Sequence, residues 1–334
     1  MTLMTSLISR SAFCFLALTC VASILTSCGG GKKSDGKKKV RLAFVTNASA
    51  DFWAYAQAGI RQAEAEFDDI EVEFKVGDGS AAKQRELCEA LLVRGVKGIA
   101  ISPTNPSGQK EMLNEWAEKA TLITVDSDAV DSNRKFYLGT DNVAAGRQAG
   151  ELLKEALPNG GKVMAFVGLG DQANAVERYR GLKEAVEGTK IEIIDLRTDE
   201  VDFGKARRNA EDTLTNYPDI AGMVGLWSYN APLILEAVRD KGVLGQVKII
   251  GFDEDPRTLK AIDKGEIHGT VVQKPYEFGY QAIVALRAMV IEGKTPKDLE
   301  IPATNQKFIE TLIIRKGEGL NYLKKCEAWK ASIK

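Results

Sequence analysis

The sequence predicts an α/β protein with two doubly wound parallel-sheet domains. Short apolar runs typical of strands alternate with segments of helical apolar spacing along most of the chain. Such alternation implies parallel strands joined by right-handed helical crossovers. A strong turn, PNGGK at 158–162, interrupts this series, and a second series follows it. Because 334 residues are enough for two domains of ordinary size, we expect two domains of similar plan.

The first series contains five predicted strands. The opening strand and helix, within 39–67, are separated by a small polar loop, TNASAD, which lies where open parallel sheets place their ligands. Later strands are bounded by glycine, proline or aspartate. The strands are expected at 40–45, 70–76, 97–102, 122–126 and 136–139, and helices at 52–67, 81–93, from Pro106 to about 119, and 142–157.

The second series repeats this arrangement with more strands. Its strands are expected at 163–168, 191–196, 223–227, 248–253, 268–273 and 308–314, and its clearest helices at 173–186, 203–216 and 276–291.

Composition indicates a folded protein without a charged macromolecular partner. Hydrophobic residues make up 44% of the chain and charged residues 27%, which are values typical of globular proteins with a core. The net charge is -1, and acidic and basic residues are interspersed. Since no basic face results, we expect no nucleic-acid partner.

The N-terminus is predicted to be a targeting segment. Residues 1–27 have a weakly basic start and an apolar core too short to span a bilayer comfortably, as in a secretory signal peptide. LTSC at 25–28 resembles the bacterial lipobox, so lipidation of Cys28 is expected, and the Gly/Lys-rich stretch 28–38 reads as a flexible tether. The alternative is an ordinary cleaved signal with a chance cysteine. Only Cys88 and Cys326 would remain in the folded part, and nothing suggests a disulfide framework.

Motifs for catalysis, metals and cofactors have little support. VGLGD at 167–171 lacks the third glycine of a dinucleotide fingerprint and has no GK[ST]. His268 is the only histidine and cannot form a zinc site without cysteine neighbours. No serine has the surroundings of a nucleophile elbow. We therefore expect no enzyme activity, no metal and no cofactor.

Polar and aromatic side chains recur at the carboxyl ends of strands and at helix starts in both halves. Taken singly, each is more often a helix cap or a packing residue. Together, rings, carboxylates, an arginine and an amide are the chemistry of sugar recognition, because rings stack on C–H faces while charged groups bind hydroxyls. The candidate ligand-binding residues are Phe52, Trp53, Asp126, Arg178, Phe203, Trp227, Asp253 and Gln273.

Eight short motifs occur along the chain: DFW (51–53), RGVKGIAISPTNPS (94–107), LITVDSD (122–128), LGTDN (138–142), ERYRG (177–181), DF (202–203), IIGFDEDP (249–256) and VVQKP (271–275). With these motifs the chain, from Lys39 to about Leu320, resembles the periplasmic sugar-binding proteins of bacterial ABC importers, specifically the ribose-binding and LacI-like branch. The resemblance implies the type I periplasmic binding protein fold, in which three hinge strands join two domains around a sugar. It also implies a monosaccharide ligand, a permease with its ATPase as partners, and a monomer.

The resemblance also implies roles for individual residues. Trp53, with Phe52 beside it, and Phe203 resemble the two opposed stacking rings. Asp126 and Arg178 resemble the groups that bind hydroxyls, while Asp253 and Gln273 match the remaining polar ligands. Three departures stand out: Ala50 where an asparagine is frequent, Ser127 where an arginine is frequent, and Trp227 where an asparagine is common. These departures predict a pocket that is more aromatic and has fewer hydrogen-bond donors than the pocket of a ribose-binding protein.

The resemblance further implies discontinuous lobes. We expect an N-terminal lobe of 39–140 plus 274–302, a C-terminal lobe of 141–273 plus 303–320, and a C-terminal tail of 321–334.

LacI-type repressors share this core but carry a helix-turn-helix where this chain has a signal segment, so DNA binding is rejected. The alternative to transport is a sensor that presents a bound sugar or autoinducer to a chemoreceptor or kinase. The mature protein is expected in the periplasm or at the cell surface, held to the membrane by its lipid.

Overall fold

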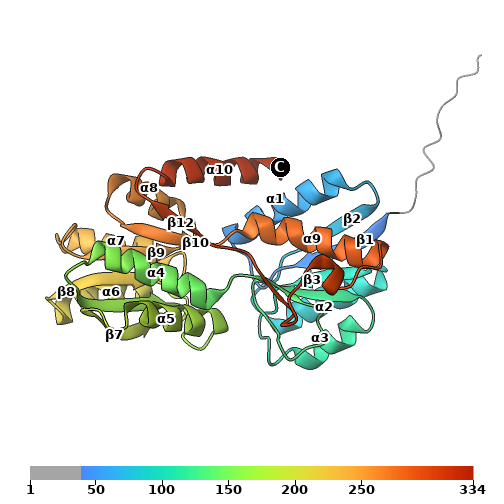
Figure 1. Cartoon of the computed structure of the whole chain (residues 1–334), viewed down its shortest axis with the longest axis horizontal. Coiled ribbons are helices and arrows are strands. Elements are labelled where there is room, and N and C mark those ends of the chain that lie inside the picture. Colours follow the sequence, from blue (N-terminus) through green and yellow to red (C-terminus); the bar gives the residue numbers. More distant parts are fainter. Residues whose placement is uncertain (1–38, 334) are drawn as a thin grey trace, which may run out of the picture. The chain divides into compact units, whose positions relative to one another are not determined.

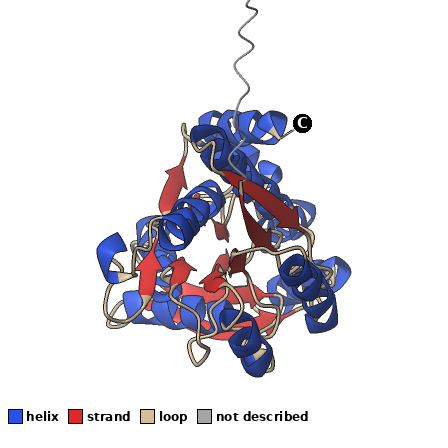
Figure 2. Ribbon diagram, turned by 90° about the vertical axis from the view of Figure 1, so that its right-hand side faces the viewer, coloured by secondary structure: helices blue, strands red, loops and turns tan. Residues whose placement is uncertain are grey.

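Two six-stranded sheets organise the protein in its computed structural model, which describes residues 39–333. The first sheet has the strand order β11-β5-β4-β3-β1-β2, and the second has the order β12-β10-β9-β8-β6-β7. Helices flank the strands of both sheets (Figures 1 and 2). The expected α/β fold with two mostly parallel sheets is confirmed.

The first sheet is parallel throughout, and its lobe contains helices from both ends of the sequence. Along β1, Leu42 and Phe44 face one core, while Ala43 and Val45 face another, so both faces of the sheet are covered. Its strands are β1 (Val40–Val45), β2 (Ile70–Lys75), β3 (Gly98–Ile101), β4 (Thr121–Val125), β5 (Tyr137–Gly139) and β11 (Gln306–Phe308). Its helices are α1 (Asp51–Glu66), α2 (Ala81–Val93), α3 (Lys110–Ala117) and α9 (Pro275–Ile291), with a short 3-10 turn, η1 (Lys297–Leu299).

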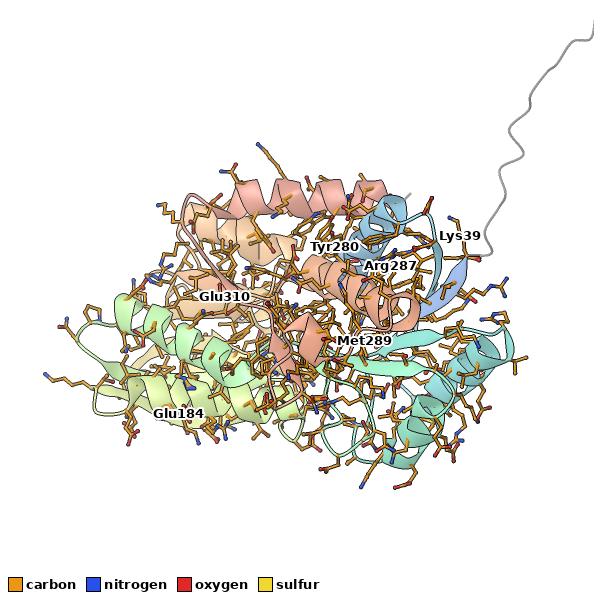
Figure 3. The ribbon with its side chains drawn as sticks, turned by 45° about the vertical axis from the view of Figure 1, so that its right-hand side comes forward. Lys39, Glu184, Tyr280, Arg287, Met289 and Glu310 are labelled. Carbon is orange, nitrogen blue, oxygen red and sulfur yellow. The ribbon has the colours of Figure 1, made fainter. Side chains whose placement is uncertain are left out.

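Helix α9 is remote in sequence from α1 but packs against it (Figure 1). Tyr280 donates a hydrogen bond to Glu66 Oε2 at 2.7 Å, and Arg287 forms an ion pair with Asp69 at 2.5 Å. Figure 3 labels Tyr280 and Arg287 on this helix. These contacts, with the buried Phe278, attach α9 to the first lobe.

The second sheet is parallel except at its edge, where β12 runs antiparallel to β10. Along β6, Met164 and Phe166 face one core, and Val163, Ala165 and Val167 face the other. Its strands are β6 (Gly161–Val167), β7 (Ile191–Thr198), β8 (Ile220–Gly225), β9 (Lys248–Phe252), β10 (Gly269–Val272) and β12 (Leu312–Arg315). Its helices are α4 (Asn142–Ala156), α5 (Ala173–Val186), α6 (Phe203–Asn216), α7 (Asn230–Asp240) and α8 (Pro256–Lys264).

The end of the chain differs from the expectation in two respects. One strand was expected over 308–314, but β11 pairs with β5 in the first sheet and β12 pairs with β10 in the second. The chain therefore passes between the sheets three times, after Gly139, after Val272 and after Phe308, and the third passage lies beyond Pro302. Residues 319–332 form helix α10 (Gly319–Ser332), which buries Tyr322, Leu323 and Cys326, in place of the expected tail.

The predicted signal peptide, the tether and the lipidation site Cys28 lie outside the described residues. Within residues 39–333, no helix combines the length and the apolar character needed to cross a bilayer.

Candidate functional site

A cavity of about 270 Å³ lies between the first turn of α1 and the carboxyl ends of strands in the second sheet. It is lined by seven of the eight candidate residues. Phe52, Trp53 and Asp126 come from the first lobe. Arg178, Trp227 and Asp253 come from the second lobe, and Gln273 lies in a connection between the lobes. Residues up to 221 positions apart in the sequence thus meet at one place, because the carboxyl ends of parallel strands share an edge of each sheet.

Phe203 is the candidate that does not line this cavity. It opens α6 and is 55% exposed, with its ring 4.7 Å from the ring of Tyr229. Tyr229 lines the cavity itself, so Phe203 packs behind a lining residue. The sequence does not indicate on which side of a helix the ring of an aromatic residue at its start will lie.

Asp126 and Asp253 occupy equivalent positions in the two lobes. Asp126 follows β4 and Asp253 follows β9, with φ values of 64° and 63°. Each backbone N–H donates to the neighbouring strand, to Leu138 O at 3.1 Å and to Val271 O at 2.8 Å. Aspartate is one of the few residues that tolerate the left-handed region. The same backbone turn thus places a carboxylate at the cavity from each side.

Burial is the largest influence on both carboxyl groups. It raises the pKa of Asp126 to about 6, although the Arg178 guanidinium and a hydrogen bond from Ser102 Oγ to Asp126 Oδ2 at 3.1 Å act in the opposite direction. Burial likewise raises the pKa of Asp253, against Arg178 and a 2.9 Å hydrogen bond from Gln273 Nε2. One guanidinium thus stabilises two carboxylates from different lobes.

Arg178 is fixed before any ligand binds. It is 3% exposed, and it donates from Nε to Asn142 Oδ1 at 3.0 Å and from Nη1 to Leu226 O at 2.9 Å. Its guanidinium carbon lies 4.7 Å from the centre of the Phe252 ring. These contacts use two of the five N–H groups of an arginine, and the others can serve a ligand.

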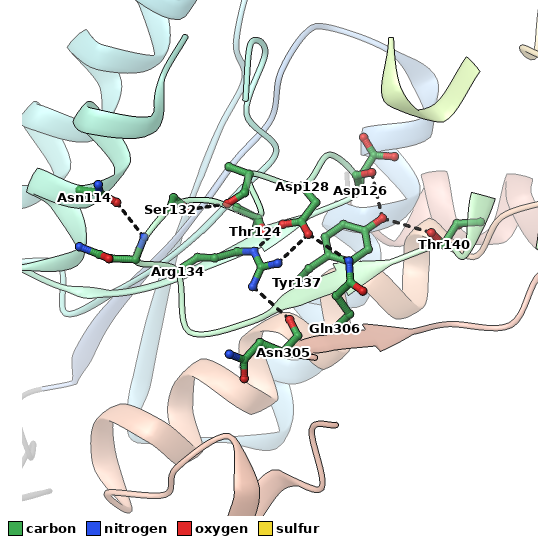
Figure 4. Close-up of polar contacts among 12 residues, drawn as sticks. Asn114, Thr124, Asp126, Asp128, Ser132, Arg134, Tyr137, Thr140, Asn305 and Gln306 are labelled. Carbon is green, nitrogen blue, oxygen red and sulfur yellow. Dashed lines mark hydrogen bonds and ion pairs between the residues drawn. The ribbon is translucent and has the colours of Figure 1, made fainter. Parts of the chain in front are cut away.

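Gln273 connects the cavity to the passages between the lobes. Its Oε1 accepts a 2.8 Å hydrogen bond from Thr140 Oγ1, while its Nε2 donates to Asp253. Tyr137 joins the same region, since its hydroxyl donates to the backbone oxygens of Asp126 at 3.1 Å and Thr140 at 3.3 Å (Figure 4). The first and second passages are therefore hydrogen-bonded to each other at the cavity.

The aromatic lining comes from both lobes. Phe52 and Trp53 meet edge to face at 4.9 Å, but Trp53 is 4% exposed and donates from Nε1 to Asn47 Oδ1 at 3.0 Å. On the opposite side, Trp227 donates from Nε1 to Asn174 Oδ1 at 3.1 Å. These hydrogen bonds hold both indoles in place beside the cavity.

Several residues that line the cavity are not among the candidates from the sequence, including Asn47, Asn174, Tyr229 and Glu254. Tyr229 stands two residues after Trp227, and Glu254 follows Asp253 directly, so proximity to a candidate was the available signal. Asn174 had no comparable signal. Glu254 is 5% exposed, its Oε2 has no hydrogen-bond partner among the described residues, and burial raises its pKa well above the ordinary value.

A second, larger cavity of about 980 Å³ adjoins the first, since Asp126 and Asn174 line both. Its wall includes the loop after β4, where Arg134 pairs with Asp128 through bonds of 2.5 and 2.6 Å and donates to Asn305 O at 3.1 Å (Figure 4). This network ties the loop that carries Asp126 to the segment that leads into β11. No cluster of three or more His, Cys, Asp or Glu residues within 39–333 is arranged to hold a metal ion.

The sequence profile of the family described as "Periplasmic binding protein domain" matches residues 42–295. The chain belongs to this periplasmic binding protein family. The predicted resemblance is therefore confirmed.

Individual members of the family are similar to this chain over most of its length. The Ribose import binding protein RbsB of Haemophilus influenzae is 28% identical over 66% of this chain and 76% of its own. The crystal structure of GanP, a glucose-galactose binding protein from Geobacillus stearothermophilus, has a TM-score of 0.75 at 28% identity and covers 84% of this chain and 98% of its own. A structure described as the XylFII-LytSN complex has a TM-score of 0.72 at 26% identity, and the match covers 83% of this chain and 98% of its own.

Proposed function

We propose that this protein captures a neutral monosaccharide, a pentose or a hexose, in the cavity between its lobes and delivers it to an ABC importer. The observation that carries the proposal is the convergence of Asp126, Asp253 and Arg178 on one aromatic-lined cavity. Carboxylates accept from sugar hydroxyls, the guanidinium donates to them, and rings cover the apolar C–H faces. The names of the similar proteins, which include a ribose and a glucose-galactose binding protein, support this ligand class.

Binding of this kind requires neither metal nor nucleotide. Charge-assisted hydrogen bonds are strong in a site that excludes water, and loss of one partner leaves the other unpaired. Truncation of a charged contact should therefore weaken binding by about 2 to 5 kcal/mol, whereas truncation of a ring should have a smaller effect.

Calorimetry against a panel of aldoses, ketoses, deoxysugars and polyols tests the proposal. We expect one or a few sugars to bind, and Asp126→Ala or Arg178→Ala to lose about 2 to 5 kcal/mol of binding free energy. Binding of an amino acid, nucleoside or autoinducer in place of every sugar would overturn the ligand class. Wild-type affinity in Asp126→Ala would overturn the site.

The proposal includes a lipid anchor on Cys28, which rests on the LTSC motif and the following Gly/Lys-rich stretch. Mass spectrometry of protein from its native host should show a diacylglyceryl-modified Cys28 as the first residue. An unmodified first residue beyond Cys28 would contradict the anchor and leave the sugar site untouched.

A second candidate function is ligand sensing. The similarity to the XylFII-LytSN complex favours it, because that family member forms a complex with a second protein. A neighbouring gene for a permease and an ATPase would support transport, whereas a neighbouring histidine kinase gene would support sensing.

A further inference from the structure

The C-terminal helix α10 contacts both lobes. Its first half is anchored on α8 of the second lobe, where the Asp263 carboxylate accepts hydrogen bonds from the N–H groups of Gly317 at 2.7 Å, Gly319 at 3.2 Å and Leu320 at 2.7 Å. A Cβ atom at Gly319 would lie 2.3 Å from Leu259 O, so the two helices approach closely. This half of α10 belongs to the second lobe.

The second half of α10 reaches the first lobe. The Trp329 ring stacks on Tyr276, at the start of α9, with centroids 4.9 Å apart and an interplanar angle of 17°. It also lies 6.0 Å from the ring of Tyr55 in α1. Lys330 Nζ forms an ion pair at 2.6 Å with Asp51, the first residue of α1. Figure 1 shows α10 extending from α8 toward α1, in agreement with these contacts.

Tyr55 completes the connection between the lobes. Although α1 belongs to the first lobe, the Tyr55 side chain is 2% exposed and packs in the core of the second lobe with Tyr322 and Cys326 of α10. The same turn of α1 contributes Asp51, Phe52 and Trp53 to the cavity wall. Movement of α1 away from the second lobe would withdraw Tyr55 from this core and separate it from Trp329.

We propose that α10 is a strap in which Trp329 and Lys330 act as positioning residues, holding the first turn of α1, and with it the cavity's aromatic wall, against the second lobe. The stacked Trp329 ring contributes most of the stabilisation of this contact between α10 and the first lobe. The Lys330–Asp51 ion pair contributes little, because Asp51 is 76% exposed and exposed ion pairs add little stability. The ligand-binding part of this inference rests on the proposed function, whereas the restraint on α1 does not.

Hydrogen exchange of the ligand-free protein tests the restraint directly. In Trp329→Ala, the amides of residues 53–58 should exchange at least about tenfold faster than in the wild type, because the turn opens more often. Trp329→Phe should restore most of the protection. Lys324→Ala, at an exposed position on the same helix, is the matched control and should leave exchange at 53–58 unchanged.

A charge reversal provides a second test in case Trp329→Ala disturbs the fold. Lys330→Glu should accelerate exchange in the first turn of α1 modestly, and adding Asp51→Lys should reverse the effect. Wild-type exchange at 53–58 in both Trp329→Ala and Lys330→Glu would overturn the strap. Acceleration spread evenly over both lobes would also overturn it, since that pattern indicates general destabilisation.

The ligand measurement separates this inference from the proposed function. If a sugar binds, Trp329→Ala should raise its dissociation rate about tenfold or more while the residues that contact it are intact. If exchange changes as expected but no sugar binds to the wild type, the strap stands and the sugar assignment fails. An unchanged dissociation rate would overturn the proposed link between the strap and the cavity wall.

Discussion

Asp126 combines a left-handed backbone with a half-buried carboxyl group, and this combination predicts a conflict between stability and binding. Burial raises its pKa from the ordinary 3.8 to about 6, so the folded state binds a proton more tightly than the unfolded state. The wild type therefore loses stability as pH rises from about 4 to 6. At neutral pH the penalty is on the order of 3 kcal/mol, because one pKa unit corresponds to about 1.4 kcal/mol.

Asp126→Asn should remove this penalty, since asparagine also accepts the left-handed backbone. We expect the variant to be more stable than the wild type by about 2 to 3 kcal/mol at pH 7.5, with the difference vanishing below about pH 4. Urea unfolding of both proteins at the two pH values measures this. A difference of the same size at both pH values would show that ionisation of Asp126 is not its cause. The variant should also bind sugar more weakly, because a charged acceptor is lost.

The aromatic residues of the second lobe should differ in their effect on binding. Trp227 lines the cavity, whereas Phe203 is exposed and packs on Tyr229. We expect Trp227→Ala to weaken sugar binding by about 1 to 3 kcal/mol, the scale of ring stacking on planar ligands, and Phe203→Ala to weaken it by less. Calorimetry with the same sugar compares them. Equal losses would mean that the Phe203 ring enters the cavity when the ligand binds.

At the scale of elements, a pair of glycines marks the closest helix crossing in each lobe. In the second lobe, a Cβ atom at Gly146 of α4 would lie 2.1 Å from Arg178 O, and one at Gly181 of α5 would lie 2.0 Å from Val143 O. In the first lobe, the corresponding atoms at Gly59 of α1 and Gly279 of α9 would meet Tyr276 O at 2.0 Å and Ala56 O at 1.9 Å. Both crossings lie next to cavity residues, Arg178 in one case and the first turn of α1 in the other.

Gly146→Ala should therefore reduce both stability and binding. The added methyl group would push α5 away from α4 and displace Arg178, and overpacking of this kind typically costs about 1 to 3 kcal/mol. Unfolding curves and sugar titrations should both show the loss. Gly204→Ala near the start of α6 is the matched control, because its Cβ atom would approach side-chain atoms, Asp202 Oδ1 at 3.1 Å and Arg208 Nη1 at 3.2 Å, and not the backbone of a neighbouring helix, so it should cost much less stability than Gly146→Ala and leave sugar affinity unchanged. Normal sugar affinity in folded Gly146→Ala would show that the crossing does not position Arg178.

The elements also show which parts of the structure the sequence could predict. Strands such as β1 and β4 are nearly continuous apolar runs buried on both faces, so their pattern is local and clear. The strands β11 and β12 have three and four residues, with Phe308 and Leu312 exposed, and only their pairing partners reveal that they belong to different sheets. Helix α10 buries Tyr322, Leu323 and Cys326 on one side, but the lysines between them obscured the pattern.

The same distinction between local pattern and tertiary packing applies to the residues of the cavity. Asp126, Asp253 and Trp227 were predicted from their positions at strand ends, which is a local property. Asn174 reaches the cavity from the start of α5, through the packing of that helix in the second lobe, which no local pattern encodes. The side of α6 on which Phe203 lies depends in the same way on Tyr229, from a different element.

At the scale of the whole molecule, ligand capture should depend on movement of the lobes about the three passages between the sheets. Each passage is short, and the first two are hydrogen-bonded to each other through Thr140 and Gln273. The proposed ligand contacts come from both sides, Asp126 from the first lobe and Arg178 and Asp253 from the second. A bound sugar that contacts both lobes favours the arrangement in which they are close, because its affinity is higher for that arrangement.

Small-angle scattering with and without a saturating sugar should therefore show a decrease in the radius of gyration. Arg178→Ala at the same sugar concentration is the matched control and should show little or no decrease, because one of the groups that joins the sugar to the second lobe is missing. A permease must distinguish loaded from empty protein, and closure of the lobes is the signal that this fold can offer. If the wild type binds sugar tightly and its scattering does not change, the lobes are rigid, and the delivery step must rest on a feature other than closure.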